Sequence, residues 1–154
     1  MLELLVTIAI VAILVALGVP ALSDFTQRAQ VRTETQRFVG IISLARSTAI
    51  TQNQVVTIQV FPAAAGQSAP IEISVDSDGD GNADTLVNRF EAEPTTLNVT
   101  TMPAGLNMIS FNQNGRLLTP NFFQLAVENQ NQNLGRTIVV NASGRSTVTE
   151  IEFN

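Results

Sequence analysis

The chain begins with an apolar run that is long enough to cross a membrane. From Leu4 to Leu22 it contains nineteen residues without a charge, and Thr7 is the only polar side chain among them. A helix of this length spans roughly 28 Å, close to the thickness of a bilayer's hydrocarbon core. The alternatives are a buried core helix or the hydrophobic region of a signal peptide, but such a region is shorter and does not continue into a helical pattern. We therefore expect a membrane-spanning helix.

Beyond Pro20 the pattern becomes amphipathic. Apolar residues recur at spacings of three and four, while the charged residues occupy other faces. The apolar positions are Leu22, Phe25, Ala29, Phe38, Ile41, Ile42, Ala45 and Ala49. This pattern predicts one helix from about residue 2 to residue 51. Because proline lacks an N–H and clashes with the preceding turn, we expect a kink at Pro20.

The remainder of the chain predicts β-strands. Val55–Phe61 and Ile71–Val75 alternate in the manner of half-buried strands. Further candidates are Leu86–Phe90, Leu97–Thr101, Met108–Phe111, Phe122–Val127, Arg136–Asn141 and Ser146–Phe153. Asn114-Gly115 is a pair favoured by a type I′ hairpin turn. The expected fold class is α+β, a long N-terminal helix packed on a compact antiparallel β domain. The expected divisions are residues 1–22, the membrane-spanning half of the helix, 23–51, its amphipathic half, and 52–154, the β domain.

Composition excludes most enzyme chemistry. The chain has no Cys, His, Trp, Tyr or Lys, so catalysis by an imidazole, a thiolate or a side-chain amine is excluded. Zinc and haem sites normally need His or Cys, which leaves only hard cations bound by oxygen. Phosphate-loop, dinucleotide-binding and nucleophile-elbow motifs are also absent from the sequence. We therefore expect no enzymatic activity and no catalytic residue.

Most of the acidity lies in one loop. The net charge is −5, and residues 51–93 carry seven acidic residues against one Arg. Carboxylates stand at positions 1, 3, 5 and 9 of a stretch with Gly81 at position 6, the spacing of calcium loops. The expected ligands are Asp76, Asp78, Asp80, Asn82 and Asp84, with Glu91 or Glu93 as additional ligands. Val87 stands where an EF-hand has its bidentate Glu, so the loop is not an EF-hand. A solvated acidic turn without calcium is the alternative.

Three arginines form a weaker candidate site. If Arg116, Arg136 and Arg145 converged on one face, they would form a phosphate site for DNA. Such a site would be weak and salt-sensitive, because no Lys adds charge and no Tyr or Trp stacks on bases. The alternative, which we expect, is that these arginines are solvated or paired with Glu150 and Glu152 and that DNA is not a partner.

The first 25 residues resemble the N-terminal segment of type IV pilins and type II secretion pseudopilins. Glu3, the apolar run and Pro20 stand where that family places its glutamate, its apolar helix and its helix-kinking proline. The later sequence resembles the GspH/FimT subgroup of minor pilins, in its acidic Asp-Gly-rich segment, the strand ending in Phe111, Asn114-Gly115 and a terminal strand pair with Gly144-Arg145. Some members of the FimT side bind DNA through a Gly-Arg-x-Arg motif, whose second Arg is missing here.

The resemblance implies a minor pilin or pseudopilin subunit of a type II secretion system or type IV pilus, acting in filament assembly and protein secretion. Such a subunit is a single-pass inner-membrane protein with its C-terminal domain in the periplasm, cleaved by a prepilin peptidase and methylated. Implied partners are a major pilin, other minor pilins, the peptidase, the inner-membrane assembly platform and membrane lipid. Glu3 would pair with the N-terminal amine of an adjacent subunit, since burying both charges together costs less than burying either alone. A filament-associated DNA-binding minor pilin and a membrane-anchored calcium-binding module are the alternatives.

The segment before Met1 affects the expected orientation. The sequence starts at Met1 and so does not include the family's leader, its Gly or the first two mature residues. We expect the gene to encode these residues upstream of the Met1 codon. Arg28 and Arg32 alone would place the β domain in the cytoplasm, because basic residues favour that side of the membrane. The basic residues of the family's leader would restore the domain to the periplasm.

Overall fold

The computed structural model describes residues 2–61, 70–80, 83–90, 97–102, 105–118, 122–129 and 134–151, apart from the side chains at 15–21, 24, 98 and 102. Within the chain two compact units are distinguished, Met1–Gln30 and Val31–Asn154. Each unit is described by itself.

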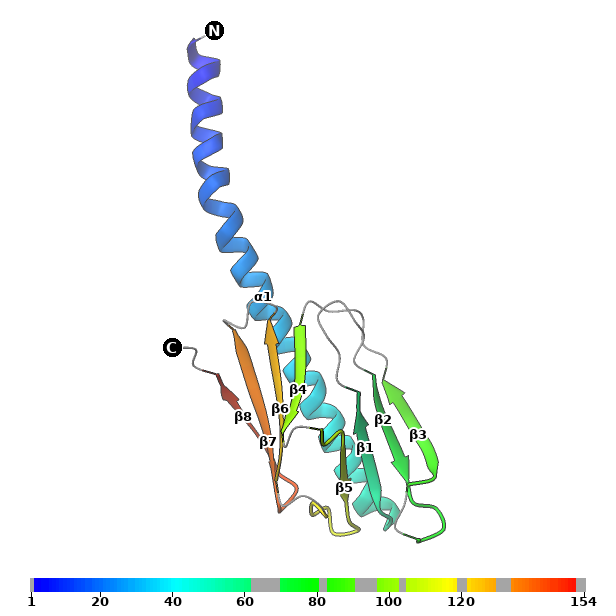
Figure 1. The fold of residues 1–154 in the computed structure, drawn as a ribbon. Helices are drawn as coiled ribbons and strands as arrows, with labels where there is room; N and C mark the ends of the chain where they lie inside the picture. Colours follow the sequence, from blue (N-terminus) through cyan, green and yellow to red (C-terminus); the bar gives the residue numbers. More distant parts are fainter. Residues whose placement is uncertain are drawn as a thin grey trace. The chain divides into compact units, whose positions relative to one another are not determined.

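One helix, α1 (Leu2–Gln52), belongs to both units and confirms the helix predicted over residues 2–51 (Figure 1). The backbone is helical at residue 20, but the Pro20 side chain lies outside the described residues, so the kink stays a prediction. The helix ends where Asn53 adopts a positive φ of 54° and the N–H of Gln54 donates to the carbonyl of Ala49 at 3.3 Å. Asparagine tolerates this left-handed conformation better than most residues, and it commonly ends a helix in this way.

Eight strands follow α1 and form two antiparallel sheets (Figure 1). The first sheet has the order β3-β2-β1-β5 and the second the order β4-β6-β7-β8. The strands are β1 (Val56–Val60), β2 (Ile71–Val75), β3 (Thr85–Phe90), β4 (Leu97–Met102), β5 (Met108–Phe111), β6 (Phe122–Asn129), β7 (Gly135–Asn141) and β8 (Ser146–Glu150). All eight predicted strands are present, which confirms the α+β prediction. Residues 152 and 153, the end of the last predicted strand, lie outside the described residues.

Alternation along the strands creates one buried face in each sheet. In the first sheet Ile58 on β1 lies opposite Ile73 on β2 and Ile109 on β5, and all three side chains are about 1% exposed. In the second sheet Leu125 on β6 lies opposite Ile138 on β7, and both are fully buried. Because side chains of a strand point alternately to opposite faces, these registers put every second residue into the core.

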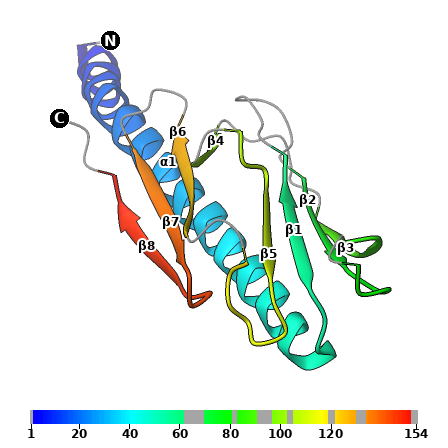
Figure 2. The ribbon, with the colours of Figure 1, turned by 60° about the horizontal axis from the view of Figure 1, so that its bottom comes forward.

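The second half of α1 supplies the layer that both sheets cover. Figures 1 and 2 show the two sheets side by side against this part of the helix. The buried side chains of the helix recur at three- and four-residue spacings: Val31, Thr35, Phe38, Ile41, Ile42, Ala45 and Ala49. Ala45 and Ala49 are completely buried. The predicted amphipathic stripe from Phe38 onward is therefore core, whereas Phe25 is 68% exposed.

The Asn114-Gly115 turn differs from the prediction. A type I′ turn needs positive φ at both central residues, but of this pair only Gly115, at 68°, has one. The N–H of Gly115 donates to the carbonyl of Asn112 at 2.8 Å, and the side chain of Asn112 accepts from Asn114 and Arg116. Because Asn112 satisfies these amides, the chain forms a longer loop with one left-handed glycine instead of the two-residue turn.

Candidate functional site

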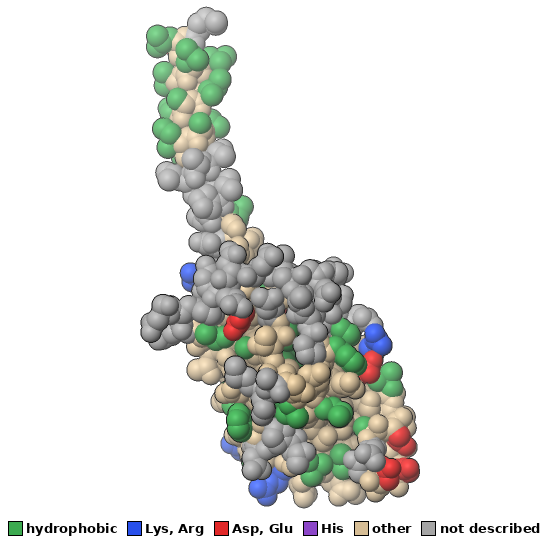
Figure 3. Space-filling view, in the orientation of Figure 1, with side chains coloured by type: hydrophobic (Ala, Val, Ile, Leu, Met, Phe, Trp, Pro, Cys, Tyr) green, Lys and Arg blue, Asp and Glu red, His purple; other side chains and the backbone are tan. Residues whose placement is uncertain are grey.

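The first half of α1 is an exposed apolar surface within its own unit. Leu2, Leu5 and Leu14 are 77%, 67% and 64% exposed, and hydrophobic side chains cover the helix near its N-terminus on the face that Figure 3 shows. Thr7, the one polar side chain in the predicted run, donates to the carbonyl of Leu4 at 2.8 Å. Its hydroxyl is therefore satisfied inside the helix, which lowers the cost of placing it in an apolar environment. Glu3, the expected assembly residue, lies in the first turn and is exposed.

The predicted membrane span cannot be followed through its whole length. It includes residues 15–21, whose side chains lie outside the described part. Over the residues that are described, no helix offers an apolar segment of the length and hydropathy that a membrane crossing requires.

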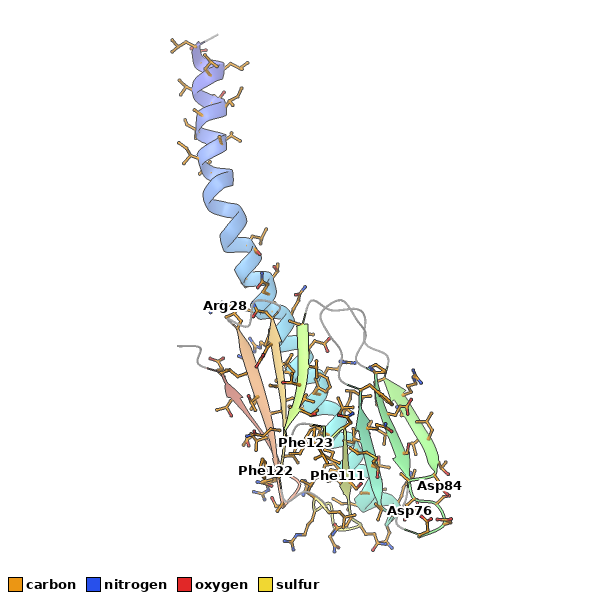
Figure 4. All side chains as sticks on the ribbon, viewed as in Figure 1. Arg28, Asp76, Asp84, Phe111, Phe122 and Phe123 are labelled. Atoms are coloured by element: carbon orange, nitrogen blue, oxygen red, sulfur yellow. The ribbon has the colours of Figure 1, made fainter. Side chains whose placement is uncertain are left out.

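The acidic loop joins β2 to β3, and Figure 4 shows Asp76 and Asp84 at its two ends. One carboxylate oxygen from each of Asp76, Asp78 and Asp80 lies within 4.8 Å of the other two. Asp76 is buried, its N–H donates to the carbonyl of Val55 at 2.9 Å, and its carboxylate accepts from the N–H of Gly79 at 2.7 Å. Three of the five expected calcium ligands are thus together on a backbone held at one end of β1.

The other expected ligands are placed differently. The carboxylate of Asp84 accepts hydrogen bonds from the N–H of Ser77 at 3.0 Å and from the Ser77 hydroxyl at 2.8 and 2.9 Å. These bonds, the backbone one first, hold the pKa of Asp84 below the usual aspartate range, because they favour the charged form. Asp84 therefore closes the loop by bonding to its start. Asn82, Glu91 and Glu93 lie outside the described residues.

The structure brings together the loops that carry two of the three candidate arginines, Arg116 and Arg145. Arg136 is near the start of β7 and pairs with Glu150 on β8 at 2.6 Å, as the alternative to DNA binding expected. Arg145 follows the other end of β7, where its loop touches the loop of Arg116. The N–H of Leu117, just after Arg116, donates to the carbonyl of Ala142 at 3.2 Å. Arg136 therefore lies at the opposite end of β7 from the other two.

Sequence reasoning missed a third arginine beside the two touching loops of Arg116 and Arg145. Arg46, on the second half of α1, donates from Nε to the carbonyl of Gly115 at 2.9 Å. It also missed a short repeat, Asn112–Arg116 (NQNGR) and Asn141–Arg145 (NASGR), which share the pattern Asn-x-x-Gly-Arg. This shared pattern is the signal within the sequence that links the two loops.

Comparison with protein families identifies the chain. The model of the family described as type II transport protein GspH matches residues 34–144, more than two thirds of the chain. The chain belongs to the GspH family. The match begins in the buried half of α1, covers every strand from β1 to β7, and ends at Gly144 in the second Asn-x-x-Gly-Arg loop, before β8. A search of curated proteins gave no significant match.

Solved structures with the same fold include minor pilins and a pseudopilin. The type IV minor pilin FimU of Pseudomonas aeruginosa superposes with a TM-score of 0.64 at 20% identity, over 81% of this chain and 92% of FimU. A second crystal form of FimU gives 0.59 at 19% identity, over 77% of this chain and 91% of FimU. The minor pseudopilin EpsH of the Vibrio cholerae type 2 secretion system gives 0.52 at 14% identity, over 78% of this chain and 96% of EpsH. Together with membership of the GspH family, this confirms the predicted resemblance to GspH/FimT-type minor pilins.

Proposed function

We propose that this chain is a minor subunit of a type II secretion or type IV pilus filament, with a role in assembly and secretion and no catalytic role. The observation that carries the proposal is the exposed apolar surface on the first half of α1. A surface of this kind is stable only when something apolar covers it. Lipid can do so before assembly, and the helices of neighbouring subunits can do so in the filament, because both present hydrocarbon.

In this proposal the first half of α1 anchors the subunit in the inner membrane and the β domain lies in the periplasm. Glu3 is the single charge between Leu2 and Leu22. An ionised carboxylate among apolar groups costs several kcal/mol unless it meets a positive partner. We expect that partner to be the N-terminal amine of an adjacent subunit. The expected partners are the major pilin, other minor pilins, the prepilin peptidase and the assembly platform.

Mass spectrometry of the mature N-terminus tests the anchoring and processing. The chain is expressed from its native locus with the codons upstream of Met1, with and without the prepilin peptidase. Peptidase-dependent cleavage that leaves a methylated residue two positions before Met1 is the expected result. A mature chain that begins at Met1 whether or not the peptidase is present would refute the proposal.

The role of Glu3 has its own test. Glu3→Gln removes the charge and keeps the size of the side chain, and we expect it to reduce incorporation into filaments by about tenfold. Glu34→Gln is the matched control, because Glu34 lies on the same helix but pairs with Arg37 at 2.8 Å. Equal incorporation of both variants would exclude a special role for Glu3.

We also propose that Asp76, Asp78 and Asp80 bind calcium, as a means of fixing the acidic loop. Ca²⁺ takes oxygen ligands at about 2.3–2.6 Å, so two of its ligands lie at most about 5 Å apart. The three carboxylates meet this limit, with oxygens within 4.8 Å of one another. In an unfolding experiment on the full chain, millimolar Ca²⁺ is expected to raise the Tm and the same concentration of Mg²⁺ to raise it less. Calcium should lose this effect in D78N/D80N; a Tm rise that survives in that variant would contradict the site.

A further inference from the structure

The two Asn-x-x-Gly-Arg loops, Asn112–Arg116 and Asn141–Arg145, have the same hydrogen bonds. In each loop the N–H of the first residue donates to the carbonyl of the fifth, at 2.9 and 3.0 Å, and the N–H of the fourth donates to the carbonyl of the first, at 2.8 Å in both. The side chain of the first Asn accepts from the N–H groups of the third and fifth residues at 3.0–3.1 Å in both loops. The arginine therefore leaves each loop from a backbone that its own hydrogen bonds hold in place.

The two loops are packed directly against each other and against the end of α1. Gly144 has a φ of 75°, and a Cβ there would overlap the carbonyl oxygen of Gly115. The same oxygen accepts the bond from Arg46, and a Cβ on Gly115 would collide with the side chain of Ile50 on α1. Only glycine permits this contact, so both loops present their arginines at one end of the domain.

The charge at this point is not neutralised within the described part of the chain. Arg116 and Arg145 are exposed, and neither they nor Arg46 form an ion pair with a described residue. Two other arginines of the β domain, Arg89 and Arg136, meet carboxylates at 2.9 and 2.6 Å. A protein with a net charge of −5 thus keeps three cations together without acidic partners among the described residues.

We propose that the two loops form a docking surface for carboxylates of a neighbouring filament subunit, which rests on the filament role proposed above. Planar guanidinium groups bind carboxylates through two parallel hydrogen bonds, and a fixed backbone reduces the entropy lost on binding. Nucleic acid fits less well, because the acidic loop lies at the same end of the domain. The N–H of Asp76 bonds to Val55, three residues after α1 ends, while Arg46 and Ile50 in the last two turns of α1 contact the two loops.

This arrangement gives the end of the domain two corners of opposite charge. Figure 3 shows acidic side chains gathered at one lower corner and basic side chains at the other, and Figure 4 labels Asp76 and Asp84 at the acidic one. A uniformly negative polymer would be repelled by the acidic corner. A protein surface can carry negative charge opposite the arginines and positive charge opposite the aspartates, so the partner that fits both corners is a protein.

A peptide-binding measurement on the full chain in nanodiscs tests the proposal. The probe is a fluorescein-labelled peptide of alternating Glu and Gly with three carboxylates, and its Gln counterpart measures binding without charge. We expect the Glu peptide to bind more tightly than the Gln peptide and to weaken with salt. R116A/R145A should lose about tenfold in affinity and keep its Tm, since the loops are held by glycine, asparagine and backbone groups. R116K/R145K keeps the positive charge but not the planar guanidinium that donates two parallel hydrogen bonds, so its loss of affinity should be smaller than that of R116A/R145A.

R89A/R136A is the matched control, because it removes two positive charges that already have carboxylate partners. It should bind the Glu peptide within about twofold of the unchanged chain. An equal loss in both double variants would overturn the proposal, since net charge alone would then explain binding. Tighter binding of a short single-stranded oligonucleotide with three phosphates would also overturn it and identify a nucleic-acid surface instead.

A cellular readout separates this proposal from the filament role itself. R116E/R145E should still be cleaved by the prepilin peptidase but should enter filaments about tenfold less than the unchanged chain. Normal incorporation of R116E/R145E would refute the docking surface and leave the filament role intact. If the unchanged chain is not cleaved at all, the filament role fails whatever the arginines bind.

Discussion

The two halves of α1 belong to one helix, yet they meet different surroundings. Apolar side chains of the first half, such as Leu5 and Leu14, are more than half exposed within the chain, whereas Phe38 and Ala45 in the second half are buried under the sheets. The first half is apolar on all sides, and the second has a single buried stripe with charges outside it. A helix that is apolar all round needs apolar cover on every side, whereas a stripe needs it on one. The sequence therefore specifies which half has its apolar side chains covered by the chain's own sheets and which half requires lipid or other subunits to cover them.

Paired substitutions of phenylalanine test this difference most strongly. Phe38→Ala removes a side chain that is 2% exposed, and we expect it to lower the free energy of unfolding by about 3–5 kcal/mol. Phe25→Ala removes the same side chain where it is 68% exposed, with an expected change within about 0.5 kcal/mol. Urea unfolding of both full-length variants measures the two values. Similar losses for both would show that the part of α1 before Val31 also packs on the folded domain.

An arginine in the first half should have the opposite effects: it should leave the stability of the β domain unchanged but weaken association with the membrane. Val11 is 57% exposed, so Val11→Arg is expected to leave the unfolding of the β domain unchanged. In a membrane the same substitution costs about 2.5–3.5 kcal/mol at the helix centre, so the chain should shift from the membrane fraction to the soluble fraction. Val11→Leu is the control and should stay with the membrane. If Val11→Arg fractionates like the control, lipid does not cover this half.

A glycine substitution measures how much the packing of the two Asn-x-x-Gly-Arg loops at the end of α1 contributes to the free energy of unfolding. Gly144→Ala adds both left-handed backbone strain and an overlap with the carbonyl that Arg46 holds, for an expected loss of about 2–3 kcal/mol. Gly105→Ala has a similar φ of 84° but open space around it, so it should cost only about 1 kcal/mol. The difference between their unfolding free energies isolates the close approach of the loops. Equal values would mean that the overlap is relieved by a small shift.

Acidification should produce the smallest effect on stability. The pKa of Asp84 is lowered in the folded chain, so its carboxylate stabilises the fold above the pKa of the unfolded chain and loses this effect as the pH falls through the folded value. Thermal unfolding should therefore show a small loss of Tm below about pH 4. Asp84→Asn should already lack this contribution at pH 7, and its curve should approach that of the unchanged chain as the pH falls. Parallel curves at every pH would contradict the role of Asp84 in closing the loop.

Local patterns were sufficient for the fold and insufficient for the sites. Helical spacing predicted α1 to within one residue at its C-terminal end, and alternation predicted all eight strands, because burial enforces these periods. The loops of Arg116 and Arg145 lie 29 residues apart in the chain, and no local pattern predicts the contact between them. The role of Asp84 was equally hidden from local patterns. Its spacing suits a metal ligand, but its carboxylate accepts hydrogen bonds from the Ser77 hydroxyl. The Asn114-Gly115 turn was misjudged because Asn112, two residues earlier, changes the bonding of the whole loop.

The continuity of α1 from Leu2 to Gln52 has a mechanical consequence. A pull that reaches Val31 along the axis of the buried half is carried onward by the helix backbone, because the helix continues through this point. There it loads all the buried side chains from Val31 to Ala49 in shear at once, instead of peeling them away one after another. Shear distributes a force over many contacts, so a domain attached in this way resists being dragged from its neighbours better than one attached by a flexible linker.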